Sequence, residues 1–400
     1  MLEFFSGSSS AVNSKTAVTE SVELATGEAI VPDCSVLVIY STVGHNFRQL
    51  LDQATTCCPN ASIVGCSGSG VISSEGVNES MRALGVMVIK GDEVCVVGKS
   101  GLDSSNGYDL ARECALEVQQ TGDAVNMIHL LTSGIPVAGN QVIDGIESVF
   151  GKDIMIFGGC SADNGKAKTT FQFIDGEVVE NGIILVGFSD PSLEVLPAVH
   201  HGSVPVGEEF VVTKSDGNLI LELDNRPAWH VLMERLGLPE NSTAGETLPM
   251  TGLGIELPED LQGEYDNTHE LRVPLSVENN NTAFRLPTEV EEGTRVVLMK
   301  RDEDLIFSGL DRLLERLQEK MQGRKPVAVF HVDCMARGRF MFNKVLKDEI
   351  IAKMQHPICG DEMAPWLGVY GYSEYCPVGG QNRFHSYTTS LFPIVRRLDA

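Results

Sequence analysis

The chain has 400 residues, of which 42% are hydrophobic and 21% are charged, and its formal net charge is −25. This composition is typical of a globular protein of two or three domains and excludes a disordered chain. A field of this sign repels phosphate groups, so we expect neither nucleic-acid binding nor adhesion to an anionic membrane.

Two further features bear on location. The sequence has no apolar run long enough for a transmembrane helix, and its first residues lack the basic and apolar segments of a signal peptide. The ten cysteines are scattered, without a CxxC pair or the dense spacing of a disulfide scaffold. We therefore expect a cytoplasmic protein with reduced, mostly buried thiols.

In chain order, the sequence begins with an expected loose tail over residues 1–13 and a helix over 14–29. A first unit of strand, helix and strand follows, because apolar runs alternate there with a helical stripe. Its expected elements are a strand at 35–42, a helix carrying Phe47, Leu50, Leu51 and Ala54, a strand and Gly/Ser turn at 61–70, a loop at 71–79 and a strand at 81–90.

The same order of elements returns twice. The second unit has strands at 125–134 and 154–165 around a helical stripe of Val142, Ile143 and Ile146, and then a hairpin over 171–188 that pivots on Asp175-Gly176. The third unit has strands at 326–334, 367–377 and 384–395 around a stripe of Leu346, Ile350 and Met354.

Each unit contains a turn rich in small residues, and the three turns align as Gly65-Cys66-Ser67, Gly159-Cys160-Ser161 and Gly371-Tyr372-Ser373. A loop feature that recurs at one place in each repeat is more readily topological than catalytic. The first turn also misses the last glycine of a Gly-x-Ser-x-Gly nucleophile elbow, and the chain has no phosphate-binding GxxxxGK motif.

A different stretch separates the second and third units. We expect a hairpin over 210–226, a short helix from Pro227 to Gly237, long connections over 238–292, a strand at 295–300 and a charged helix at 302–320. The predicted fold is α/β with mixed sheets, in two domains with repeated strand–helix–strand units and long hairpins. The expected divisions are a tail and helix (1–30), an N-terminal domain (31–222) and a C-terminal domain (223–400).

The densest chemistry lies in HVDCMARGRF, residues 331–340. In one interpretation, Arg337 and Arg339 clamp a carboxylate of a ligand. In a second, Cys334 packs inward and the arginines pair with some of the 55 acidic residues of the chain. In a third, Cys334 beside two guanidiniums is a nucleophile of depressed pKa.

The nine histidines form neither an HExxH motif nor a His-x-His metal pair. His200 and His201 are adjacent, so within a strand they would point to opposite faces. Two Cys-Pro pairs, which recur as thiolate haem ligands in some sensors, are a weak signal here.

Several segments, taken together, resemble the FIST proteins, which are bacterial sensory modules with an N-terminal and a C-terminal FIST domain. The resemblance covers roughly residues 31–391. It rests on IVGCSGSGVI (63–72), IFGGCSADNG (156–165), the segments 200–228 and 292–306, DCMARGRFMF (333–342), and GVYGYSEYCP with FHSYTTS (368–390). Ser373 replaces the glycine that the family has before the acid at Glu374.

The resemblance implies ligand sensing and no enzymatic activity. A two-domain FIST chain without an output domain looks like the nitric-oxide-sensing haemoproteins of the family (NosP), which report to a partner histidine kinase in cyclic-di-GMP pathways. The alternative is a haem-free FIST sensor of a small metabolite such as an amino acid. Homo-oligomer formation is left open.

If the chain binds haem, we expect a histidine to be the ligand of iron, because a neutral imidazole suits ferrous iron and nitric oxide. Our order of candidates is His201 or His200, then His331, then His385 and His356, with Arg337 and Arg339 as partners of the haem propionates. The complete set of expected cofactor-contacting residues is His200, His201, His331, Cys334, Arg337, Arg339, Glu374 and His385.

Overall fold

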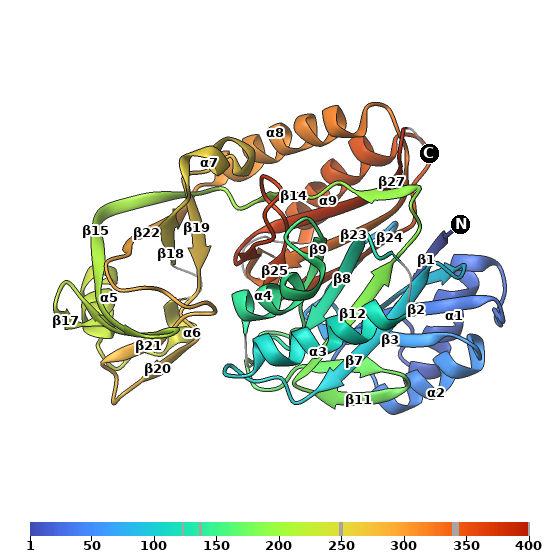
Figure 1. The fold of residues 1–400 in the computed structure, drawn as a ribbon, viewed down its shortest axis with the longest axis horizontal. Helices are drawn as coiled ribbons and strands as arrows, with labels where there is room; N and C mark the ends of the chain where they lie inside the picture. Colours follow the sequence, from blue (N-terminus) through green and yellow to red (C-terminus); the bar gives the residue numbers. More distant parts are fainter. Residues whose placement is uncertain (122–123, 136–137, 248–250, 338–343, 399–400) are drawn as a thin grey trace.

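The computed structural model describes residues 1–121, 124–135, 138–247, 251–337 and 344–398. The chain forms a body of three sheets and a separate lobe, which lies to the left in Figure 1. The α/β class with mixed sheets is confirmed. No helix in these ranges is both long and apolar enough to cross a membrane.

The three repeated units predicted from the sequence make up the body. We name them unit 1 (residues 3–90), unit 2 (94–188) and unit 3 (303–396). In each unit two parallel strands flank a helix, and an antiparallel strand pairs with the first of them. These strands are β2 (Cys34–Thr42), β3 (Ser62–Gly68) and β6 (Leu84–Lys90); β8 (Met127–Thr132), β9 (Met155–Cys160) and β12 (Gly182–Phe188); and β23 (Pro326–Cys334), β24 (Trp366–Gly371) and β27 (Thr389–Arg396).

The inner faces of the three sheets share one apolar core. Val38, Phe157 and Phe330 are fully buried there, one from each unit. His129 lies against the rings of Phe157 and Phe330, and its Nε2 is bonded to Tyr40 Oη at 3.0 Å. Each outer face is covered by a pair of helices with its own apolar cluster. The pairs are α1 (Ser14–Thr26) with α2 (Phe47–Cys57), α3 (Gly107–Gln120) with α4 (Gly139–Phe150), and α8 (Glu303–Met321) with α9 (Lys344–Cys359).

Each unit lends a hairpin to a neighbouring sheet. The hairpin of unit 1 pairs with β24 of unit 3, that of unit 2 with β3 of unit 1, and that of unit 3 with β9 of unit 2. This circular exchange buries the edges of the parallel strands, so no unit completes its sheet alone. The hairpins are β4 (Val71–Ser73) with β5 (Gly76–Asn78), β10 (Phe171–Ile174) with β11 (Glu177–Glu180), and β25 (Glu374–Tyr375) with β26 (Phe384–His385).

The predicted alignment of the three turns was wrong, because it does not pair the residues that occupy equivalent positions in the strands. Gly65 pairs with Ile39, Gly158 with Leu130 and Gly368 with His331, so these glycines are the equivalent positions. A Cβ atom would lie 1.9 Å from the facing carbonyl oxygen at Gly65, 2.0 Å at Gly158 and 2.8 Å at Gly368. What repeats is therefore a close approach of two parallel backbones, which only glycine permits.

Other local predictions fared differently. The turn at Asp175-Gly176 is confirmed, with positive φ at both residues as a type I′ turn requires. The expected tail is wrong, because β1 (Glu3–Ser9) pairs with β6. The expected loop at 71–79 is the hairpin β4–β5, and β7 (Val94–Ser100), which pairs with β12, was not predicted.

The lobe spans residues 203–301 and contains strands in the region expected to be long connections. Its long first strand, β15 (Ser203–Asp216), pairs with both β16 (Leu219–Leu223) and β22 (Arg295–Arg301). The remaining elements are β17 (Arg226–Pro227), α5 (Ala228–Leu236), α6 (Ala244–Thr247), β18 (Gly252–Glu256), α7 (Glu259–Tyr265), β19 (His269–Arg272), β20 (Ser276–Glu278) and β21 (Ala283–Arg285). The short helix that ends at Gly237 is confirmed.

Two chain crossings join the lobe to the body. The first follows β13 (Leu193–Val195) and β14 (Ala198–His200), and the second leads from β22 into α8. The crossings are bonded together, because the amide of Asp302 donates to Gly202 O at 3.0 Å. The expected division at residues 222 and 223 falls inside the lobe and stays a prediction.

Candidate functional site

The end of the first parallel strand in each unit carries polar residues at equivalent positions. The strand pairings align Asp333 and Cys334 of unit 3 with Ser41 and Thr42 of unit 1, and with Thr132 and Ser133 of unit 2. Only unit 3 has an ionisable pair there. Because the equivalent strand ends of units 1 and 2 carry neutral residues, the strand arrangement itself does not require charge at this position.

In units 1 and 2 the hydroxyls at these positions complete local hydrogen bonds. Thr42 Oγ1 accepts from the amide of Ala83 at 2.8 Å, and Ser133 Oγ donates to Ile135 O at 2.6 Å. Thr132 Oγ1 lies 3.1 Å from Tyr375 Oη. These neutral groups are satisfied within the fold.

In unit 3 a buried ion pair takes their place. A single 3₁₀ turn over Met335–Arg337 returns the Arg337 side chain to Asp333, and Nε donates to Oδ1 at 3.0 Å. The side chains of Asp333 and Arg337 are only 3% and 2% exposed. Desolvation raises the pKa of Asp333 to about 6, against the lowering effect of the Arg337 guanidinium.

Glu374 brings a second buried carboxyl group to this pair. It lies in the hairpin that unit 3 lends to unit 2, and its Oε2 accepts from Thr388 Oγ1 at 2.7 Å. Desolvation raises its pKa well above the ordinary value, and the charge of Asp333 adds to the increase. Glu374 Oε1 and Arg337 Nη2 are buried and make no hydrogen bond with any described residue.

Cys334 points away from the ion pair. Its thiol lies in an apolar cluster between body and lobe, with Val297 and Tyr387 among its members. Burial raises its pKa well above the ordinary value. The thiolate needed by a nucleophile is therefore disfavoured at neutral pH, and the packing interpretation describes Cys334 best.

Four of the five candidate histidines are buried, but they do not share one cavity. His200 donates from Nε2 to Leu305 O (3.2 Å), His201 to His269 O (3.0 Å) and His385 to Cys376 O (2.8 Å). His331 Nε2 lies 2.9 Å from Thr389 Oγ1. Desolvation lowers the pKa of each imidazole, to about 3 at His201 and His331 and to about 4 at His385.

This arrangement does not fit haem as it stands. The Nε2 atom of each of these four imidazoles is already bonded, and His201 Nδ1 also accepts from the amide of Ser203 at 2.9 Å. Pockets of about 760, 410, 180 and 20 Å³ open on the described surface, and no histidine or cysteine lines any of these four. The described residues also hold no cluster of three or more metal-ligating side chains.

The structure therefore brings part of the predicted site together. Arg337 contacts both Asp333 and, through Nη1, the carbonyl of His201 at 3.4 Å, where the chain crosses to the lobe. His200 packs against α8 with its ring centroid 6.3 Å from that of His201, and His356 is exposed. Arg339 lies outside the described residues. Asp333 was missed as a site residue, although its place in the motif between His331 and Arg337 was a usable signal.

The small-residue turns play the topological role expected of them. They contact one another through backbone hydrogen bonds: Ala162 N to Ser67 O at 2.8 Å, Cys160 N to Ser373 O at 2.9 Å, and Ser69 N to Tyr370 O at 2.9 Å. Burial raises the pKa of both Cys66 and Cys160. The ring of turns thus joins the three units and offers no activated thiol.

Comparison with known proteins identifies the family to which the chain belongs. The profile of the FIST N domain matches residues 35–226, and that of the FIST C domain matches residues 228–377. An uncharacterized protein of Mycobacterium tuberculosis is 25% identical over 334 residues, 83% of each chain. An uncharacterized protein of Methanocaldococcus jannaschii is 24% identical over 372 residues, covering 86% of this chain and 67% of the other.

A structural comparison matches a cyanuric acid hydrolase from A. caulinodans with a TM-score of 0.36 and 10% identity, over 99% of this chain and 100% of the other. A likeness at this level carries no argument about fold or activity.

Proposed function

The chain belongs to the FIST family of sensory proteins, and we propose that it senses a small zwitterionic metabolite, such as an amino acid, held by Arg337 and Glu374. The observation that carries this proposal is the buried charge at the strand end in unit 3, where the equivalent strand ends of units 1 and 2 carry neutral hydroxyls. Buried charges are costly, and a fold that does not need them retains them for another purpose.

The chemistry of the two groups selects the ligand class. Arg337 Nη2 is a donor without a partner among the described residues and suits a carboxylate. Burial favours the protonated form of Glu374, and a bound ammonium group would stabilise its carboxylate, whose Oε1 has no other partner in the described part of the chain. Asp333 holds the guanidinium in place from the other side. An α-amino acid has an ammonium group and a carboxylate group attached to one carbon atom, and their charges complement those of Glu374 and Arg337.

The position of the site offers a route for a signal. Arg337 reaches the carbonyl of His201 at the crossing into the lobe, and Cys334 packs against lobe residues. Because the two free polar atoms are sealed, ligand entry requires body and lobe to shift relative to each other. Binding would then favour one arrangement of the two parts, which a partner protein reads. No catalytic step is part of this proposal.

Haem-based nitric oxide sensing, reported to a partner histidine kinase in a cyclic-di-GMP pathway, is the competing proposal. It is supported by the family resemblance and by the lowered pKa values of the buried imidazoles, which favour the neutral form that binds iron. It requires one histidine to give up its present Nε2 hydrogen bond or to bind iron through Nδ1, which in His331 and His385 is buried without a partner among the described residues. Arg337 would then pair with a propionate.

Calorimetric titration with individual amino acids tests the first proposal. We expect saturable binding to the full chain, abolished in Glu374→Gln and weakened at least about tenfold in Arg337→Lys, because Lys cannot present the same planar pair of donors. Arg324→Lys is the matched control, since Arg324 also forms a partly buried ion pair, with Glu194, in another part of the body. Circular dichroism establishes that each variant is folded.

Addition of haemin separates the two proposals. A haem sensor would give a Soret band that shifts with nitric oxide and changes in an alanine variant of His200, His201, His331 or His385. Amino-acid binding without such a band supports the metabolite sensor. A Soret band that a histidine variant removes, without amino-acid binding by the apoprotein, would overturn it.

A further inference from the structure

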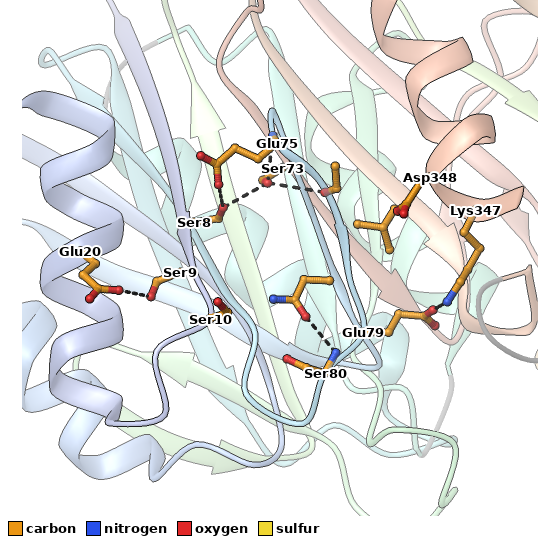
Figure 2. A pocket seen from close by; sticks show the side chains of 13 residues that line it. Ser8, Ser9, Ser10, Glu20, Ser73, Glu75, Glu79, Ser80, Lys347 and Asp348 are labelled. Carbon is orange, nitrogen blue, oxygen red and sulfur yellow. Dashed lines mark hydrogen bonds and ion pairs between the residues drawn. The ribbon is translucent and has the colours of Figure 1, made fainter. Parts of the chain in front are cut away.

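A polar cavity lies where unit 1 meets unit 3. A cavity of about 760 Å³ opens between β1, α1, the hairpin β4–β5 and the first turn of α9. Figure 2 shows Glu20 and Ser9 facing it from the side of α1, and Lys347 and Asp348 from α9. It is far larger than one water molecule and has the volume of a small-molecule site.

The walls of this cavity are hydrophilic. Apart from Val77 and Gly76, its lining consists of serines, one asparagine and charged residues, with no aromatic side chain: Ser8, Ser9, Ser10, Glu20, Ser73, Glu75, Asn78, Glu79, Ser80, Lys347 and Asp348. Such a lining selects a polar ligand with several hydrogen-bonding groups, because an apolar ligand would leave the wall groups unpaired.

Serine side chains orient two of the carboxylates. Ser9 Oγ donates to Glu20 Oε2 at 2.6 Å, and Ser8 Oγ donates to Glu75 Oε2 at 3.1 Å. The other oxygen of each carboxylate makes no hydrogen bond with a described residue. Both side chains border the open space in Figure 2. The acceptors are therefore held in place before any ligand arrives, which lowers the entropy cost of binding.

The charge balance of the cavity is negative. Its one cation, Lys347, already forms an ion pair with Glu79, and both side chains are about nine-tenths buried. Glu20, Glu75 and Asp348 form no ion pair with another described residue. Three negative charges thus surround the space without compensation.

The carboxylates of the cavity do not form a metal-binding cluster among the described residues. No three acidic side chains of the described residues come close enough together to hold one metal ion. The carboxylates come instead from α1, the hairpin and α9, on different walls. Separated negative charges along a polar cavity match an elongated ligand with separated positive charges.

We propose that this cavity binds a linear aliphatic polyamine. Its ammonium groups pair with Glu20, Glu75 and Asp348, the serine hydroxyls accept further N–H bonds, and a methylene segment lies against Val77. The ligand would bridge unit 1 and unit 3 at a seam that the β4–β5 hairpin also crosses. This site is separate from Arg337 and does not depend on the function proposed for it.

Calorimetry with spermidine on the full chain tests the proposal. The net charge of −25 attracts any polycation, so the test needs two variants of equal charge. The cavity variant is Glu20→Gln/Glu75→Gln/Asp348→Asn. The control is Asp109→Asn/Glu259→Gln/Glu291→Gln, which neutralises three exposed acids elsewhere.

We expect one saturable site that the cavity variant weakens more than about twentyfold, while the control and Arg337→Lys change it less than about threefold. Mg²⁺ at equal ionic strength should displace the polyamine only weakly. Equal losses in the cavity and control variants, or complete displacement by Mg²⁺, would show diffuse counterion attraction and overturn the proposal. Absence of saturable binding at low salt would overturn it as well.

Discussion

The ends of β2 and β23 are equivalent in the fold and opposite in chemistry. At the end of β2, Thr42 and its neighbours are neutral and bond to adjacent backbone. At the end of β23, Asp333 and Arg337 are buried charges, and Arg337 keeps one donor free. The difference shows that the repeated strand arrangement does not need charged residues at this position. Unit 3 carries a buried ion pair there, whose desolvation is unfavourable.

The largest loss of stability is expected from substitution of the glycines that units 1 and 2 share. Gly65→Ala and Gly158→Ala should each destabilise the protein by about 5 kcal/mol, because Cβ would lie within 2.0 Å of a carbonyl oxygen. Urea unfolding measures this loss. Gly263→Ala, in an open position on α7, is the control and should be neutral or slightly stabilising. A small effect at Gly65 would contradict the close backbone approach.

The next largest loss of stability is expected from removal of the Asp333–Arg337 ion pair. Arg337→Met should cost about 4 kcal/mol, because it leaves Asp333 buried without its partner. The double variant Arg337→Met/Asp333→Thr, which introduces the threonine that unit 2 has at this position, should recover most of this stability. Chemical unfolding of both variants measures the difference. If the double variant is as unstable as the single one, the charges are part of the fold and the comparison fails.

The pH dependence of stability sharpens the comparison further. The pKa of Asp333 in the folded protein, about 6, lies above its ordinary value of 3.8, so the folded state holds the proton more tightly. This contribution is complete below pH 4 and is lost as the pH rises to 6, by on the order of 2 kcal/mol. Urea unfolding at pH 4.5 and 6.5 should show the decline in the native chain and not in Arg337→Met/Asp333→Thr.

The smallest effect belongs to the neutral turn. Ser67 Oγ donates to Ala162 O at 2.7 Å and accepts from the amide of Phe171 at 3.0 Å. Ser67→Ala should cost about 1–2 kcal/mol without changing ligand binding, because it removes two hydrogen bonds that are structural only. Thermal unfolding and the amino-acid titration together check this. A loss of binding would place the turn in the site.

The sequence predicted much of the local structure, since helix stripes and alternating strands are written in neighbouring residues. The helix α2 and the turn at Asp175-Gly176 were found in this way. The hairpin β4–β5 was taken for a loop, because its partner strand β24 lies almost 300 residues away in the chain. The alignment at Cys66 and Cys160 failed for a similar reason: sequence likeness aligned the cysteines, while strand register aligns Gly65 with Gly158.

The sequence by itself determined three repeated units, their small-residue turns and the motif that holds His331, Cys334 and Arg337. Only the tertiary structure decided which of these residues share a site and in what state. Cys334 packs into an apolar cluster, while strand exchange places Glu374 in the sheet of unit 2. Burial raises the pKa of the Asp333 and Glu374 carboxyl groups. Periodicity is a property of neighbouring residues, whereas desolvation and strand exchange depend on segments that meet only in the folded chain.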